Sequence, residues 1–123
     1  MAREGNICLV LQGQFYDAIL NGTKDTEFRD GTEYYDQRFF HTRNGEVLLD
    51  KNGKPIPKDI KTVTFINGYR RGARRMTYEV EHIDIYQECA DGDIIEIPLN
   101  ELEDDVPLQF QYDYAIHLGK RIT

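Results

Sequence analysis

Short hydrophobic runs separated by polar turns make up the chain, and the first two predict a strand followed by a helix. Residues 7–12, ICLVLQ, are apolar over the length of a strand, which is typical of a strand buried on both faces. Phe15 and Ile19 then lie four residues apart, a spacing that predicts a helix of about two turns from near Gln14. Gly22 ends the predicted helix, because glycine readily adopts the left-handed conformation that follows a helix.

The rest of the pattern is mostly that of strands joined by turns. The aromatic side chains of residues 33–43 recur at spacings that favour one helix face over strand alternation. Asn52-Gly53 predicts a two-residue hairpin turn. Alternation changes parity near His82, so we expect a bulge or bend in that strand. Residues 100–105 predict an acidic loop or short helical turn, and strands are predicted in four segments, 61–69, 75–86, 92–99 and 110–122.

Together these elements predict a single α+β domain over residues 1–123, with a small, curved, mostly antiparallel sheet or barrel and one or two flanking helices. The 40% hydrophobic and 30% charged side chains fit a folded globular protein. No apolar run approaches the roughly 20 residues that span a bilayer, and the N-terminus lacks a signal-peptide pattern. We therefore expect a cytoplasmic protein with no membrane partner. Cys8 and Cys89 are expected to be buried thiols, with a disulfide between them as the alternative.

Charge is distributed unevenly along the chain. The net charge of −7 argues against long duplex DNA or RNA as a partner, because a negative protein repels a polyanion. Acidic residues crowd the stretch 79–105, whereas residues 69–75, YRRGARR, hold four arginines. These arginines form either a locally basic surface or a solvated hairpin turn, and the sequence leaves both open.

Several kinds of chemistry lack the residues that they need. The three histidines, His41, His82 and His117, stand in different elements without metal-ligand spacing, so we expect no metal and no cofactor. The chain contains no serine, which excludes a serine hydrolase, and no phosphate-binding loop with its lysine and hydroxyl. Cys89 lies beside acidic residues, which disfavour a reactive thiolate.

The stretch GTKDTEFRDG, residues 22–31, is the one that indicates a site. Lys24 follows the end of the predicted helix, where the partial negative charge of the helix favours an ammonium group. Glu27 and Arg29 lie two residues apart and share a face if the chain is extended there, and Lys24 can reach them across a turn. This arrangement fits either a ligand pocket or an ion pair that only holds a loop.

Three blocks of the chain resemble a known family. FYDAILNGTKDTEFRD resembles the signature of the ASCH domain, a branch of the PUA-like superfamily, in which spaced lysine, glutamate and arginine residues follow a helix. VTFINGYRRGARRMTYEVEHI is similar to the central strands of that family, and YAIHLGKRI to its closing strand. The resemblance spans residues 7–119 and implies a PUA-like, β-barrel-like fold with a cleft beside the first helix.

The resemblance also implies a protein that binds RNA or a nucleotide-like small molecule. At the matching positions the cleft residues are Lys24, Glu27 and Arg29, with Tyr69 and Arg70 as further contributors. A carboxylate can accept hydrogen bonds from a base amino group, a guanidinium can bind a carbonyl or phosphate, and a tyrosine can stack on a base. RNA or a modified nucleoside is therefore the expected ligand.

An enzyme is the alternative, because some members of the family are small amidohydrolases that deacylate N4-acetylcytidine with a lysine, a threonine and a glutamate. The family threonine lies three positions after the lysine, where this chain has Glu27, and Thr26 is one residue out of place. This departure counts against the threonine mechanism. Lys24 and Glu27 remain the candidate catalytic pair, with the carboxylate as base for water and the ammonium stabilising negative charge. Candidates for a third carboxylate are Glu88, Glu101 and Glu103.

Overall fold

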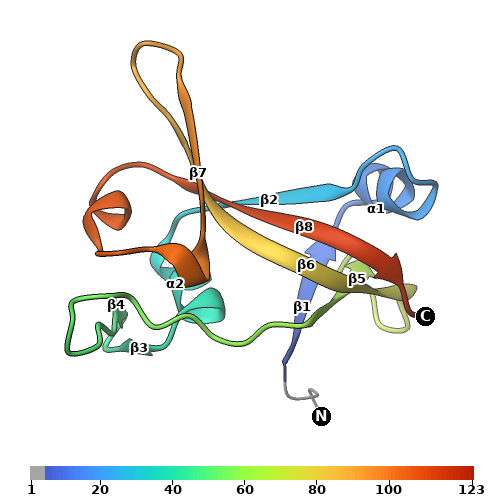
Figure 1. Ribbon diagram of the computed structural model, residues 1–123. Helices are drawn as coiled ribbons and strands as arrows, with labels where there is room; N and C mark the ends of the chain where they lie inside the picture. The colour runs from blue at the N-terminus through green and yellow to red at the C-terminus, as the bar shows by residue number, and fades with distance from the viewer. Residues whose placement is uncertain (1–4) are drawn as a thin grey trace. The chain divides into compact units, whose positions relative to one another are not determined.

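The structure is a computed structural model and describes residues 5–123 (Figure 1). Its helices are α1 (Gly13–Leu20), α2 (Glu33–Phe39) and the short 3-10 helices η1 (Leu99–Glu101) and η2 (Val106–Gln109). Its strands are β1 (Asn6–Leu11), β2 (Thr26–Asp30), β3 (Thr42–Arg43), β4 (Glu46–Val47), β5 (Thr62–Asn67), β6 (Arg75–Glu88), β7 (Ile94–Pro98) and β8 (Asp113–Arg121).

Six of these strands form one sheet, and β3 and β4 form a separate short hairpin. The strand order is β1-β5-β6-β8-β2, with β7 paired to β6 beside this path. β1 and β5 are parallel, whereas β6 is antiparallel to both β5 and β7, as expected where a short turn joins successive strands. The predicted α+β class, with a mostly antiparallel sheet and two α-helices, is confirmed for the described residues.

The described residues divide into two compact units. The first unit holds the residues up to Glu27 together with Asp59–Glu81 and His117–Thr123. The second unit holds Phe28–Lys58 and His82–Ile116. The boundaries fall inside β2, β6 and β8, so each of these strands contributes one part to each unit. The single domain over residues 1–123 stays a prediction.

Burial in β6 changes parity where the sequence pattern predicts it. Met76 and Tyr78 are buried in the first part of the strand, and Ile83 and Ile85 in the second part. His82 is exposed at the point of change. The change of parity among the buried apolar residues is therefore confirmed, with Asp84 also buried between Ile83 and Ile85, and the bulge or bend near His82 stays a prediction.

In the first unit, α1 buries Tyr16 and Ile19, which are 1% and 2% exposed. The Tyr78 hydroxyl donates to the Ile19 carbonyl oxygen at 3.2 Å and so joins the helix to β6. Gly22 has a φ of +82° and follows the end of α1, as predicted. Phe15, whose spacing with Ile19 predicts the helix, is 44% exposed, and its neighbour Tyr16 faces the core.

β1 is also less buried than its apolar sequence predicts. Ile7, Leu9 and Leu11 are buried, whereas the alternate positions are only half-buried. The expectation of a strand buried on both faces is therefore wrong for one face. β1 pairs in parallel with β5, and apolar residues alternate with half-exposed ones along both strands, so one side carries most of the core contacts.

In the second unit, the aromatic segment forms α2, which confirms the helical interpretation for Glu33–Phe39. The Thr32 side chain caps the helix by accepting a hydrogen bond from the Tyr35 amide at 3.4 Å. Phe39 and Phe40 are completely buried at the other end of α2. The ring of Phe39 lies 4.5 Å from that of Tyr114, centroid to centroid, and this contact fixes the helix on β8.

The turn at Asn52-Gly53 is confirmed, but it is longer than the predicted two-residue type. The Asp50 amide donates to the Lys54 carbonyl oxygen at 2.8 Å, and this pair encloses three residues. The Asp50 carboxylate also accepts from the amides of Asn52 and Lys54. Gly53 has a φ of +80°, which is the conformation that a three-residue turn needs at its last position.

The other predicted strands and thiols also appear in the structure. The segment 92–99 contains β7, and 110–122 contains β8. Tyr112, just before β8, is buried, as are Tyr114, Ile116 and Leu118 within it. The predicted acidic loop contains η1 and is followed by η2. Cys8 and Cys89 are both thiols and are half-buried rather than buried. Among the described residues, none of the helices has the length and apolar character needed to cross a membrane.

Candidate functional site

The loop after α1 is built to present Lys24. The Lys24 amide donates to the Ala18 carbonyl oxygen at 3.0 Å, and the Thr23 hydroxyl donates to the same oxygen at 3.1 Å. The Thr23 hydroxyl also lies 2.9 Å from Asn21 Oδ1. These bonds occupy a carbonyl group that the end of a helix otherwise leaves without an intrahelical partner. These hydrogen bonds therefore fix the backbone of the loop, and with it the position from which the Lys24 side chain extends.

Lys24 and Glu27 form the ion pair that their spacing predicts. Lys24 Nζ lies 2.5 Å from Glu27 Oε1, a short charge-assisted hydrogen bond. Glu27 is 4% exposed, whereas the lysine side chain is 27% exposed. Lys24 Nζ also lies 5.1 Å from the centroid of the half-exposed Phe15 ring, a cation–π contact.

A carboxylate as deeply buried as Glu27 needs compensation. Removal of an ionised carboxylate from water costs several kcal/mol, and a lysine in contact offsets this cost. The partner is partly accessible, so a ligand that reaches the pair meets the ammonium group first. Chemically, the pair can accept and donate hydrogen bonds side by side, which suits the donor and acceptor edge of a nucleobase.

Thr26 points away from this pair, as expected for extended chain. β2 begins at Thr26, and the burial along it alternates, with Glu27 buried and Thr26 half-buried. The Thr26 hydroxyl lies 3.4 Å from His117 Nδ1 and 3.2 Å from Asp25 Oδ1. The Thr26 hydroxyl thus has Asp25 and His117 as partners.

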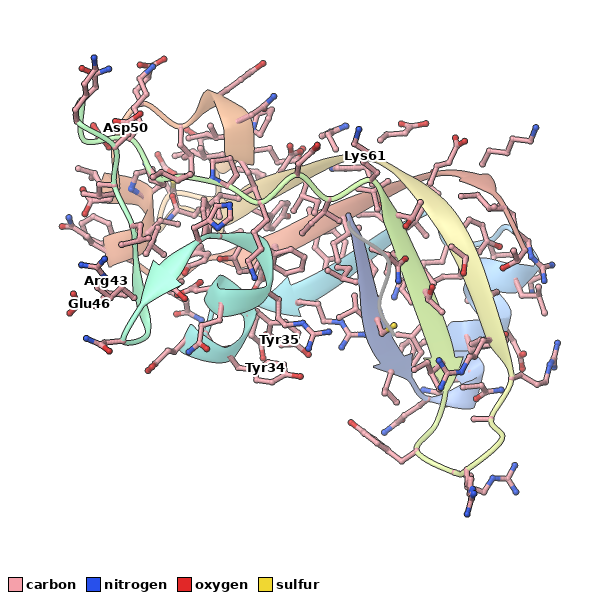
Figure 2. The ribbon with its side chains drawn as sticks, turned by 90° about the horizontal axis from the view of Figure 1, so that it is seen from below. Tyr34, Tyr35, Arg43, Glu46, Asp50 and Lys61 are labelled. Atoms are coloured by element: carbon pink, nitrogen blue, oxygen red, sulfur yellow. The ribbon has the colours of Figure 1, made fainter. Side chains whose placement is uncertain are left out.

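Arg29 belongs to the second unit and is held there by an aromatic partner. Its Nη1 donates to the Tyr35 hydroxyl at 2.9 Å, and its guanidinium carbon lies 5.7 Å from the centroid of the same ring. Tyr35 projects from α2 beside Tyr34, and both are labelled in Figure 2. The guanidinium thus has a local structural partner in addition to the role in ligand binding that the sequence predicts.

Tyr69 and Arg70 lie on the loop between β5 and β6 in the first unit. Tyr69 is 93% exposed, the most exposed large hydrophobic side chain among the described residues. Arg70, Arg71, Arg74 and Arg75 are all exposed as well. Gly68 and Gly72 take positive φ values of +80° and +77° and shape the loop.

The candidate third carboxylates, and one further histidine, lie in the second unit. Glu101 and Glu103 are exposed in the acidic stretch around η1, and Glu103 contacts Lys54 at 3.1 Å. Glu88 lies at the end of β6 and lines a pocket. His82 Nε2 lies 3.4 Å from Asp84 Oδ2 in the same unit.

Two features of the second unit were missed by the sequence interpretation. Asp36 Oδ1 accepts hydrogen bonds from the hydroxyls of both Tyr112 and Tyr114. Burial is the main cause that raises the pKa of each tyrosine above its ordinary value, and the hydrogen bond to Asp36 raises it further. The second feature is a pocket of about 450 Å³ that includes Glu88 but none of Lys24, Glu27, Arg29, Tyr69 and Arg70.

No protein-family model, curated protein or solved structure matches this chain. The ASCH and PUA-like resemblance therefore remains a prediction from the three sequence blocks.

Proposed function

We propose that the chain is a PUA-like ASCH domain that binds RNA or a modified nucleoside. The recognition residues in the first unit are Lys24, Glu27, Tyr69 and Arg70. Arg29 is included only because it matches the family motif. The observation that carries the proposal is Tyr69, a tyrosine 93% exposed on a loop with four exposed arginines. An accessible ring flanked by cations suits the stacking of a base and the contact of its phosphates.

The charge of the first unit supports this choice. Its sequence segments hold nine lysine and arginine residues against seven aspartate and glutamate residues, although the whole chain carries a net charge of −7. A single strand or a nucleoside that contacts only this unit therefore meets a positive surface. Extended duplex contacts, which would also involve the acidic remainder of the chain, remain unfavourable.

Fluorescence anisotropy with a short labelled single-stranded RNA tests the loop. Tyr69→Ala is expected to raise the dissociation constant about tenfold, since one stacked base contributes about 1–3 kcal/mol. Arg70→Ala should weaken binding and flatten its dependence on salt, because fewer counterions are released.

The second unit offers matched controls for both variants. Tyr34 is 62% exposed on α2 and has an arginine, Arg38, 5.8 Å from its ring centroid, so Tyr34→Ala removes a comparable exposed ring. Arg43 in β3 is exposed and gives the control Arg43→Ala (Figure 2). If the Tyr34 and Tyr69 variants lose equal affinity, or if binding does not depend on salt, the loop is not the contact surface.

Hydrolysis of an N-acylated nucleoside is the second candidate, and the 2.5 Å contact between Lys24 and Glu27 favours it. In such a reaction Glu27 takes a proton from water, the hydroxide adds to the acyl carbon, and Lys24 stabilises the negative oxygen. As the tetrahedral intermediate collapses and its C–N bond breaks, Glu27 returns this proton to the leaving nitrogen, so that the amine and a carboxylic acid are released and the carboxylate is regenerated. Incubation with N4-acetylcytidine, followed by mass spectrometry, distinguishes the two functions. Cytidine and acetate formed by the wild type but not by Glu27→Gln would establish the enzyme, and binding without product would establish recognition.

A further inference from the structure

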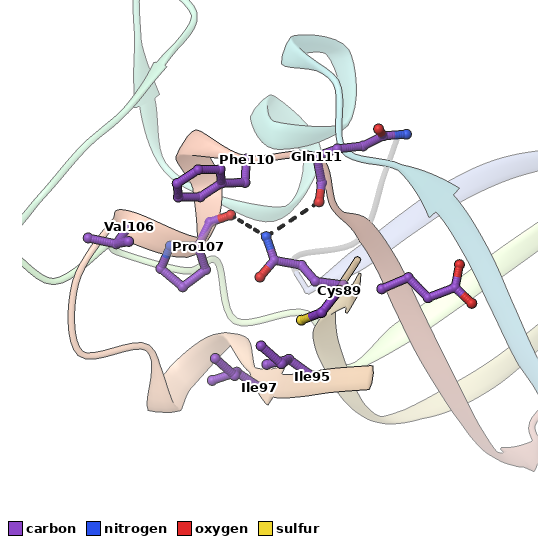
Figure 3. Close-up of a pocket in the computed structure, with 9 residues that line it drawn as sticks. Cys89, Ile95, Ile97, Val106, Pro107, Phe110 and Gln111 are labelled. Atoms are coloured by element: carbon purple, nitrogen blue, oxygen red, sulfur yellow. Dashed lines mark hydrogen bonds between the residues drawn. The ribbon is translucent and has the colours of Figure 1, made fainter. Parts of the chain in front are cut away.

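The pocket of the second unit lies between β7 and the segment that contains η2. Ile95 and Ile97 of β7 form one wall, and Val106, Pro107 and Phe110 form the opposite wall (Figure 3). Cys89, at the end of the β6 strand region, lies between the walls. At about 450 Å³ the pocket is in the size range of ligand-binding sites, and its lining is mostly apolar.

The walls are held at their spacing by the Gln87 side chain. Gln87 Nε2 donates to the Pro107 carbonyl oxygen at 2.7 Å and to the Gln111 carbonyl oxygen at 3.4 Å, as the dashed lines in Figure 3 show. Both acceptors belong to the segment that forms the second wall. Because β6 is hydrogen-bonded to β7, these contacts connect the two walls.

The pocket also belongs to a surface with several exposed apolar side chains. Phe110 is 67% exposed, Val106 is 50% exposed and Ile95 is 40% exposed. Exposed apolar clusters of this kind, when polar residues surround them, are typical of interaction sites. β7 also has only one strand neighbour, β6, in the sheet that residues 5–123 form. An extended peptide can pair with such an edge while its side chains enter a neighbouring pocket.

The charge around the pocket restricts the partner. Residues 82–116 contain ten aspartate and glutamate residues and no lysine or arginine. Burial, with the negative charges of Asp30 and Glu88, raises the pKa of Asp113 in the same unit, as expected of a strongly acidic neighbourhood. This surface repels nucleic acid, anionic lipid and an identical acidic surface of a second copy.

We propose that this pocket binds a basic segment of a partner protein that inserts one large apolar side chain between β7 and η2. The apolar side chain fills the pocket, and flanking lysine or arginine side chains lie over acidic residues such as Glu88 and Glu96. The proposal does not depend on the proposed nucleic-acid function, because the two use different residues of different units. Failure of one leaves the other standing.

Cys89 provides a direct readout of the pocket. In a Cys8→Ala background Cys89 is the only thiol, so its rate of alkylation by iodoacetamide reports whether the pocket is covered. The probe is a pentapeptide with one tryptophan between two pairs of basic residues, and a fluorescent label on it gives its affinity by anisotropy. At a peptide concentration of about twice its dissociation constant, the alkylation rate should fall about threefold. Two control peptides, one with glycine for tryptophan and one with acidic residues for the basic ones, should leave the rate unchanged.

Neighbouring residues of β7 supply the matched variants. Ile95 lines the pocket, whereas Ile94 is 55% exposed and does not line it. Ile95→Ser should abolish the protection of Cys89 by the peptide, and Ile94→Ser should retain it. Each variant is compared with its own rate without peptide, which removes any change in the basal reactivity of the thiol.

Three results would overturn the proposal. The first is absence of binding, or binding that leaves Cys89 as reactive as before. The second is equal protection of Cys89 by the glycine peptide, which would mean that the basic residues of the peptide bind the acidic surface without any side chain entering the pocket. The third is a concentration-dependent dimer in sedimentation, without peptide, in which Cys89 is protected and Tyr69→Ser restores its reactivity. That result would assign the pocket to the basic loop of a second copy.

Discussion

The two units hold a carboxylate in two different ways. In the first unit Glu27 is 4% exposed and contacts the ammonium group of Lys24, three residues away in the sequence. In the second unit Asp36 is half-buried and accepts from two neutral phenols, Tyr112 and Tyr114, from the far end of the chain. One carboxylate is thus compensated by a charge and the other by hydrogen-bond donors without charge.

The difference bears on which carboxylate can take part in binding. The tyrosines are 6% and 0% exposed, so the Asp36 cluster is closed to a ligand and serves to fix α2 on β8. Lys24 is partly exposed, so a ligand can contact the ammonium group while its contact with Glu27 stays in place. Of the two sets of partners, the lysine of the first unit is thus more exposed than the tyrosines of the second.

Gly31→Ala should break the Asp36 cluster and give the largest loss of stability. A Cβ atom at Gly31 would lie 2.5 Å from the Tyr112 carbonyl oxygen and equally close to its ring. The backbone of β8 would have to move, so we expect a loss of about 3 kcal/mol in the free energy of unfolding. Urea denaturation measures it.

Gly119→Ala, in the first unit, is the control for this substitution. There the nearest atom to a new Cβ would be Glu81 Cγ at 3.2 Å, which belongs to a flexible side chain. We expect a cost of less than about 1 kcal/mol. Equal losses for the two glycine variants would mean that the packing of Tyr112 on Gly31 does not hold the cluster.

The second largest loss of stability is expected for Lys24→Met, which tests whether the charge of Lys24 stabilises the buried Glu27 carboxylate. The buried Glu27 would lose its contacting cation, at a cost of about 2 kcal/mol, below the usual figure for a buried pair because the lysine is partly exposed. Glu27→Gln should cost less, since an amide is easier to bury than a carboxylate.

A double-mutant cycle on these two positions isolates the pair. The double variant Lys24→Met/Glu27→Gln should be more stable than Lys24→Met alone, because it no longer buries a carboxylate deprived of its cation. Simple addition of the two single losses would show that the pair is not coupled, and would remove the argument for a functional carboxylate held by Lys24.

The contrast between the units also explains what the sequence could predict. Lys24 and Glu27 are three residues apart after a helix end, so spacing and loop geometry predict their contact. Asp36 and the two tyrosines are separated by 76 and 78 residues, and only the packing of α2 on β8 brings them together. Periodicity correctly places Tyr112 and Tyr114 on one face of a strand, but it carries no information about the opposing helix.

The pocket was missed for a related reason. Its first wall was predicted as the strand 92–99, which agrees with the structure, whereas Val106 and Pro107 of the second wall lie between the predicted acidic loop, 100–105, and the predicted strand, 110–122, and Phe110 lies outside β8. Nothing in the alternation of Ile95 and Ile97 predicts that Val106 and Phe110 lie opposite them, because this depends on the path of the loop. In α1 the spacing of Phe15 and Ile19 predicts the helix, but it does not show that Tyr16 is the buried aromatic residue, since Phe15 and Tyr16 are adjacent and both fit a helix face.

A smaller loss of stability is expected for Tyr114→Phe, which tests how much the neutral hydroxyl donors stabilise the Asp36 carboxylate. It removes one of the two hydroxyl donors to Asp36 and keeps the buried ring. We expect a loss of about 1.5 kcal/mol, which is the usual size for a hydrogen bond to a charged group. Tyr35→Phe, which removes the hydroxyl that accepts from Arg29, is the control with a more exposed ring and should cost less. Similar losses would contradict a special role for Asp36.

The smallest effect is a difference in alkaline sensitivity between the wild type and Tyr114→Phe. Burial, and then the bond to Asp36, raises the folded-state pKa of Tyr114 above the value of about 10 that it has in the unfolded chain. A raised pKa contributes stability that is fully present below pH 10 and is lost as the pH rises above it, because the unfolded state gives up its proton first.

Between pH 9 and pH 11 the wild type should therefore lose about 1 kcal/mol more than Tyr114→Phe. Titration of the lysines affects both proteins and cancels in the difference. Urea denaturation at the two pH values measures the free energies, and parallel losses would show that the Tyr114 hydroxyl is not held in its neutral form by the fold.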